Sequence, residues 1–166
     1  MGQRPLNELV ELLKDESEVL DRLLGLLLDQ RRLIPAGKPD EFLINLDHQE
    51  RLILELERLE SKRLGLIQSL GRELGLGPER YTLDGLIEAD PDHRSLFHPL
   101  RERLMYLVQK VMEVNQGNQY LIGRFLGLVR QSIQLLFGLD AGGFYAPSGK
   151  LSGGQGQLRK AIDKRV

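Results

Sequence analysis

Residues 95–137 read SLFHPLRERLMYLVQKVMEVNQGNQYLIGRFLGLVRQSIQLLF, and their apolar side chains return at alternating steps of three and four. Ten of the twelve positions on this seam are apolar, the exceptions being Asn118 and Ser132. The seam consists of Phe97, Leu100, Leu104, Leu107, Val111, Val114, Asn118, Leu121, Phe125, Leu128, Ser132 and Leu135. This spacing predicts one continuous helix that packs in the manner of a coiled coil. At about 1.5 Å per residue the helix is about 60 Å long, so we expect an elongated molecule.

Two more long helices are expected upstream of this segment. Apolar residues recur at helical spacing from Leu6 to about Leu33, and Pro35, Gly37 and Pro39 then interrupt the pattern. A second segment, from about Asp40 to Leu74, has a heptad-like spacing in which Arg63 occupies one seam position among Leu52, Leu56, Leu59, Leu66 and Leu70. A short connection between the two predicts that they pack antiparallel.

A short helix and a glycine-rich tail complete the predicted fold. Thr82 is a typical N-cap for the apolar turn that follows it, and Asp90-Pro91 ends that turn. From Gly138 onward the glycines are too dense for a stable helix. The predicted fold is therefore all-α: an elongated antiparallel bundle of three long helices plus one short helix over residues 1–138, and a flexible Gly-rich C-terminal tail over residues 139–166.

Composition and charge exclude several classes of function. The chain has 23 basic and 24 acidic residues, well mixed and with a net charge of -1, so it has no broad positive surface for nucleic acid. It has no cysteine for disulfide or thiolate chemistry. The N-terminus lacks an apolar signal region, and the run Leu23–Leu28 is far too short to span a membrane. We expect a cytoplasmic protein that binds no nucleic acid.

One stretch near the C-terminus resembles nucleotide-binding motifs. Residues 151–155 read LSGGQ, which is spelled like the signature of ABC-type ATPases, and Ser148-Gly149-Lys150 before it resembles the end of a phosphate loop. A phosphate loop also needs a glycine five residues before Gly149 and a hydroxyl after the lysine, but Gly143 is one place too early and Leu151 follows. No strand is expected before it, so we predict no ATPase, no enzyme activity and no cofactor.

The remaining polar residues do not form a recognisable reaction centre. No two of His48, His93 and His98 are spaced to share one face of a helix, so no metal site is expected. The carboxylates alternate with lysine and arginine, as on a solvated helix face.

Asn118 leaves two interpretations open. An amide at a seam position fixes the register of packed helices at a cost in stability, and Gly117 beside it weakens a helix by about 1 kcal/mol relative to alanine. Alternatively, the polar segment that contains Asn115 and Asn118 faces a partner.

The order of these elements resembles the FlgN family of flagellar type III export chaperones, over about residues 6–151. The residues that carry the resemblance are the leucine-rich, acidic first helix (Leu9, Leu12, Leu13, Glu16, Leu20, Leu23), the second helix (Leu59, Lys62, Leu66, Leu70), the short segment Thr82-Leu83-x-x-Leu86-Ile87, the repeat Asn115-x-x-Asn118-x-x-Leu121, and Phe144-Tyr145-x-x-x-Gly149-Lys150-Leu151.

The resemblance implies a cytoplasmic chaperone that binds the C-terminal helices of hook-filament junction proteins and delivers them to the export gate. It also implies that the segment with Tyr145 and, four residues later, Gly149 docks to the cytoplasmic domain of the gate membrane protein through Tyr145. The Gly-rich extension from Ser152 to Val166 departs from the family pattern.

Helix-in-groove binding suits a client of this kind. We expect Leu121, Phe125, Leu128 and Leu135 to anchor the client, with Asn115 and Asn118 beside them. The alternative is a structural coiled-coil or bundle protein that self-associates through the same seams, and a homodimer is also left open.

Overall fold

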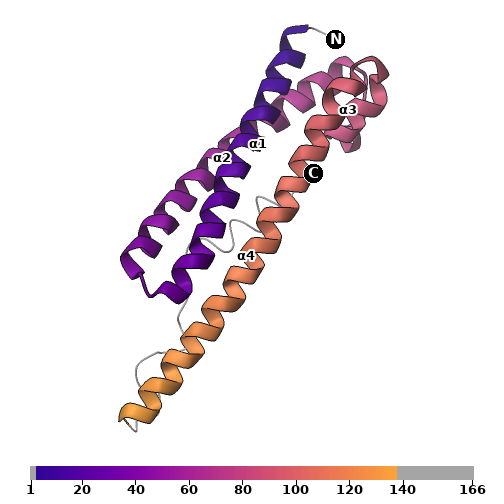
Figure 1. The fold of residues 1–166 in the computed structure, drawn as a ribbon. Helices are drawn as coiled ribbons and strands as arrows, with labels where there is room; N and C mark the ends of the chain where they lie inside the picture. Colours follow the sequence, from indigo (N-terminus) through magenta and orange to yellow (C-terminus); the bar gives the residue numbers. More distant parts are fainter. Residues whose placement is uncertain (1–2, 138–166) are drawn as a thin grey trace.

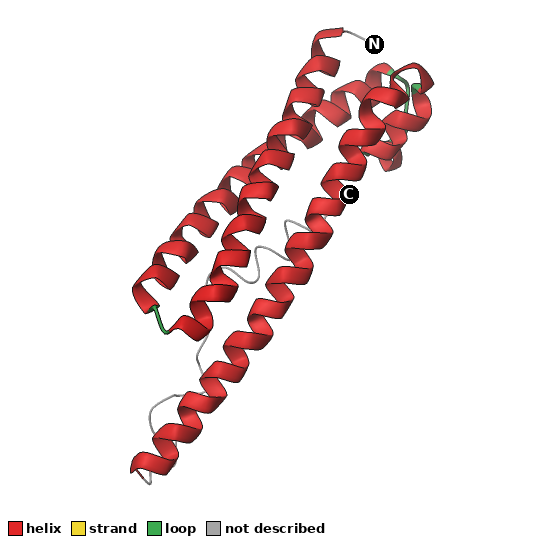
Figure 2. Cartoon of the chain, in the orientation of Figure 1, coloured by secondary structure: helices red, strands yellow, loops and turns green. Residues whose placement is uncertain are grey.

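Three long helices and one short helix make up the part of the chain that the structure describes (Figures 1 and 2). The structure, a computed structural model, describes the backbone of residues 3–137 and the side chains of residues 4–133. The elements are α1 (Gln3–Ala36), α2 (Pro39–Glu73), the 3-10 turn η1 (Pro78–Arg80), α3 (Leu83–Ala89), the 3-10 turn η2 (Pro91–His93) and α4 (Arg94–Phe137). The predicted all-α fold is confirmed for these residues; the expected tail and its boundary at residue 138 lie outside them.

Helix α1 is the middle layer of the bundle. It contacts α2 along one side and α4 along the other, whereas α2 and α4 make almost no direct contact with each other in the described chain. α2 runs antiparallel to α1, as predicted, and α4 runs parallel to α1 (Figure 1).

The connection between α1 and α2 is shorter than the sequence suggests. Pro35 lies inside the last turn of α1, and Pro39 is the first residue of α2. A proline is tolerated at the first position of a helix because the amide hydrogen that it lacks would have no partner inside the helix. The turn depends on Gly37, which has a positive φ of 64° that glycine adopts without strain.

Helix α4 is continuous through Gly117, Gly123 and Gly127. Its first half is covered by the bundle: Phe97, Leu107 and Val111 have at most 2% of their surface exposed. Its second half continues beyond the turn between α1 and α2 (Figure 1). The predicted seam is thus a packed interface as far as Asn118, and its described side chains beyond that residue are exposed.

The short helix α3 begins as predicted. The Thr82 hydroxyl accepts a 3.0 Å hydrogen bond from the backbone amide of Gly85, which satisfies one of the amides left free at the start of the helix. The two 3-10 turns on either side of α3 were not predicted, and each begins at a proline.

Candidate functional site

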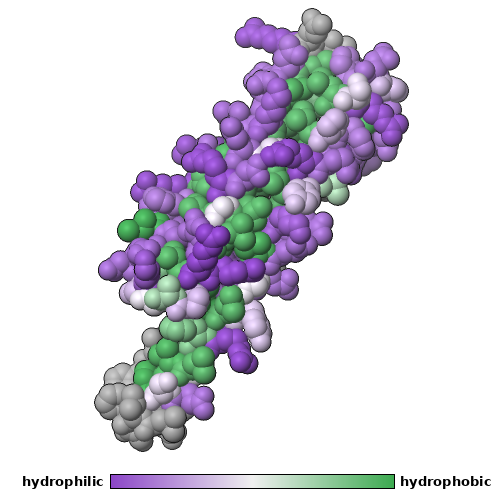
Figure 3. Space-filling view, viewed as in Figure 1, coloured by the Kyte–Doolittle hydropathy of each residue, from purple (hydrophilic) through white to green (hydrophobic). Residues whose placement is uncertain are grey.

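The end of α4 exposes a continuous set of apolar side chains. We call residues 119–137 the α4 extension; they follow Asn118, which is the last side chain of α4 that is buried in the described chain. The large apolar side chains that are exposed on the extension are Tyr120, Leu121, Phe125, Leu126, Leu128, Val129 and Ile133. Figure 3 shows this apolar surface on the part of α4 that leaves the bundle. Contiguous apolar surface of this kind marks an interaction site.

The predicted client anchors lie on this extension. Leu121, Phe125 and Leu128 are 37%, 44% and 59% exposed. Leu135 belongs to the last turns of α4, but its side chain lies outside the described part of the chain. The seam pattern did not select Leu126, Val129 or Ile133, although each is apolar and close to a seam position, because a strict heptad picks only two positions in seven.

The exposed face is the direct continuation of the buried one. Phe125 follows Leu107 by eighteen residues, and Val129 follows Val111 by the same number, which is about five full helical turns. Each pair therefore points in the same direction from the helix axis. Leu107 and Val111 are 2% and 0% exposed inside the bundle, whereas Phe125 and Val129 are 44% and 39% exposed beyond it. Among the described residues, no element covers on the α4 extension the face that α1 covers upstream.

A polar cluster lies where the covered face ends. Asn118 is 1% exposed, and its side-chain amide donates hydrogen bonds to the Leu27 carbonyl (2.7 Å) and to Gln30 Oε1 (2.8 Å). Its carbonyl oxygen accepts a 3.2 Å hydrogen bond from Arg31 Nε. Asn118 therefore lies inside the interface between α1 and α4, as the register-setting interpretation requires, with 1% of its surface exposed; its role toward a client stays a prediction. Asn115 is half-buried.

Gly117 lies against a long side chain of α1, which the sequence did not indicate. A Cβ at this position would collide with the Arg31 guanidinium, which crosses α4 there and also donates a 3.4 Å hydrogen bond to the Val114 carbonyl. The guanidinium is the end of a flexible side chain, so a Cβ at position 117 would displace this contact without blocking the packing of α1 on α4.

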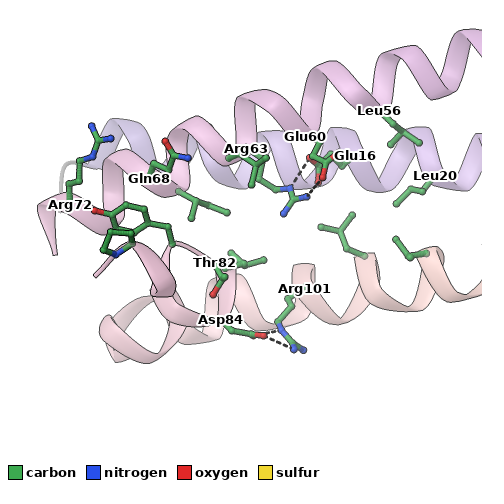
Figure 4. A pocket seen from close by; sticks show the side chains of 17 residues that line it. Glu16, Leu20, Leu56, Glu60, Arg63, Gln68, Arg72, Thr82, Asp84 and Arg101 are labelled. Atoms are coloured by element: carbon green, nitrogen blue, oxygen red, sulfur yellow. Dashed lines mark hydrogen bonds and ion pairs between the residues drawn. The ribbon is translucent and has the colours of Figure 1, made fainter. Parts of the chain in front are cut away.

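A groove of about 890 Å³ lies between α2 and α4 at the α3 end of the molecule (Figure 4). Its floor includes Glu16 and Leu20 of α1, and α2 and α4 form its walls. Figure 4 shows the Arg63 side chain pointing from α2 toward Glu16, and Arg63 Nε donates a 2.9 Å hydrogen bond to Glu16 Oε1. Burial raises the pKa of Glu16 above its ordinary value of 4.5, and the charge and hydrogen bond of Arg63 oppose this shift. The arginine that occupied a seam position in the sequence thus has a buried carboxylate as its partner.

The described residues contain no group of three or more His, Cys, Asp or Glu side chains that could hold a metal ion. Within the same part of the chain, no helix has an apolar stretch long enough to cross a membrane. Tyr145 and Gly149, the predicted docking residues, and the LSGGQ stretch lie outside the described residues.

Comparison with known proteins identifies the family. The family described as FlgN protein matches residues 1–153, which is most of the chain. No curated protein and no solved structure gives a significant match. The match covers all four helices, including the α4 extension. The chain belongs to the FlgN family of flagellar export chaperones.

Proposed function

We propose that this protein is a cytoplasmic chaperone that binds the C-terminal helical segments of hook-filament junction proteins, keeps them unassembled and delivers them to the type III export gate. Membership of the FlgN family supports a role in flagellar export in general. The observation that supports client binding at a definite place is the uncovered apolar face of the α4 extension.

Physical chemistry favours a helix as the ligand of this face. Upstream, the same face of α4 packs against α1, so its side chains already have the spacing that another helix requires. A junction protein that has not yet assembled exposes amphipathic helices that would otherwise associate with one another. Binding such a helix removes apolar surface of both molecules from water, at about 25 cal/mol for each Å².

The test is a pulldown with the C-terminal peptide of a junction protein. The variant Phe125→Asp/Leu128→Asp replaces two apolar side chains by carboxylates. A client helix that packed on them would have to remove these charges from water, so we expect client binding to be lost. The matched control is Tyr106→Asp/Met112→Asp, which changes two side chains of α4 with similar exposure, 58% and 48%, beside the bundle. Circular dichroism checks that both variants stay helical. Unchanged binding by the Phe125→Asp/Leu128→Asp variant would contradict the assignment of the site.

The docking step rests on the family resemblance of Tyr145 and Gly149. We expect Tyr145→Ala to keep client binding and to weaken association with the cytoplasmic domain of the gate protein, measured by two separate pulldowns. Equal loss of both interactions would show that Tyr145 is structural instead.

Self-association through the same face is the competing function. The mass of the protein in solution, measured with and without the client peptide, separates the two. A chaperone gains mass when the client peptide is added, whereas a structural bundle protein shows no change in mass.

A further inference from the structure

We propose that the α4 extension selects a helix whose apolar face is bordered by acidic side chains, and that Arg124 and Arg130 recognise these acids. This inference rests on the proposed function, because it specifies the chemistry of the segment that binds the site. It is argued from three observations: the charge of the extension, the positions of its two arginines, and the way in which α1 binds the same face upstream.

The extension is basic although the whole chain is almost neutral. From Val114 to Phe137 the sequence contains no aspartate or glutamate, and its only charged residues are Arg124 and Arg130. Both arginines are exposed, and neither forms an ion pair within the described residues. Within this part of the chain, no acidic side chain neutralises the two positive charges.

The two arginines border the apolar face on opposite sides. Phe125 and Val129 mark the centre of the face that α1 covers upstream. At about 100° per residue, Arg124 lies about 120° to one side of that centre and Arg130 lies about 120° to the other. Leu126 and Leu128 lie at the two edges of this face, about 80° from its centre, and each arginine lies about 40° beyond one of them. From there a long arginine side chain can extend toward the edge of a helix that packs on the centre.

The contact between α1 and α4 shows the same arrangement inside the molecule. Arg103 of α4 forms an ion pair with Asp21 of α1, beside the buried apolar seam. Farther along α4, its next arginines are Arg124 and Arg130. A helical ligand that packs on α4 in line with α1 therefore needs acidic side chains at its edges, as α1 has Asp21.

A second copy of the chain and a lipid membrane fit this surface less well. Two α4 extensions packed face to face would bring four arginines together with no acid between them, and like charges in contact oppose association. Segments that bind anionic membranes carry clusters of about four to eight basic residues, and the extension has two.

The experiment uses the full-length protein and two synthetic helical peptides of about eighteen residues. Both peptides carry the same stripe of leucines; one has glutamate and the other has lysine at the edge positions. Calorimetry at low salt should give a Kd that is about tenfold lower for the glutamate peptide, because two exposed ion pairs replace two repulsions. The ratio should shrink at high salt.

The variant Arg124→Glu/Arg130→Glu should reverse the preference and bind the lysine peptide more tightly. The control Arg58→Glu/Lys62→Glu changes two exposed charges of α2 by the same amount and should keep the preference for the glutamate peptide. Reversal in the first variant alone supports the proposal.

Equal affinity for the two peptides would overturn the inference, and so would a preference that does not reverse in the Arg124→Glu/Arg130→Glu variant. A doubling of the protein's mass without peptide would point to a second copy of the chain instead. Binding to vesicles with 30% phosphatidylserine that competes with both peptides would point to a membrane instead. If the junction-protein peptide still binds when the designed peptides are not distinguished, the proposed function stands and only the charge selection fails. If neither the junction peptide nor a designed peptide binds, both fail.

Discussion

The side-chain amide of Asn118 donates a 2.7 Å hydrogen bond to the backbone carbonyl of Leu27, across the interface between α4 and α1. The same amide binds Gln30, whose side chain is also buried. These hydrogen bonds set the register of α4 along α1. They lie where the apolar face of α4 changes from buried against α1 to exposed.

Asn118→Ala should lower the free energy of unfolding by about 2–3 kcal/mol, because the buried Gln30 oxygen and the Leu27 carbonyl lose a donor and a small cavity forms. Urea unfolding measures the change. Asn115→Ala is the control: Asn115 is half-buried one turn away, and the loss there should stay below about 1 kcal/mol. Equal losses in the two variants would mean that the cluster contributes nothing specific.

Arg63→Met should destabilise the protein in a way that depends on pH. At neutral pH it leaves the Glu16 carboxylate buried without its main partner, which costs about 3 kcal/mol. The pKa of Glu16 is already raised in the folded protein, and removal of Arg63 raises it further. The folded state then binds a proton more tightly than the unfolded state, so the free energy of unfolding falls as pH rises between the two pKa values.

The difference in stability between wild type and Arg63→Met should therefore be largest near pH 7 and should shrink as the pH is lowered toward 4.5. Urea titrations at several pH values measure it. The double variant Glu16→Leu/Arg63→Met removes both charges and should show little of this pH dependence. A difference that is constant with pH would contradict the assignment to Glu16.

Gly71→Ala and Gly65→Ala should have opposite effects although both glycines lie in α2. A Cβ at Gly71 would lie 2.6 Å from Cδ1 of the Tyr81 ring, so alanine should cost about 1–3 kcal/mol. Gly65 is exposed with nothing within 4 Å of a Cβ, so alanine should stabilise the helix by up to about 1 kcal/mol. Thermal and urea unfolding of the two variants test the sign of each effect.

Thr82→Ala should cost about 1 kcal/mol, because the amide of Gly85 loses the hydroxyl that caps α3. Thr82→Ser keeps that hydroxyl and should stay close to wild type. Hydrogen exchange at the first amides of α3 reports the local effect. A serine variant as unstable as the alanine variant would point to the methyl group of Thr82, not to the cap.

The sequence predicted the helices well and the coverage of α4 poorly. The seam of α4, the cap at Thr82 and the unusual position of Arg63 were all visible because each depends on local spacing. The apolar spacing around Phe125 is the same as the spacing around Leu107. It therefore could not reveal that α1 covers Leu107 and leaves Phe125 exposed. Nor could it show that Gly117 makes room for Arg31, since that contact joins residues far apart in the chain.

The central position of α1 has a consequence for the order of folding during synthesis. α1 and α2 are adjacent in the chain and can pair as soon as both have left the ribosome. Among the described elements, only α4 covers the other side of α1. A fragment that ends at Ala89 should therefore bind more of a dye for apolar surfaces, and aggregate more readily, than the chain through Phe137. An export chaperone built in this way needs its own apolar surface covered during synthesis before it can cover that of another protein.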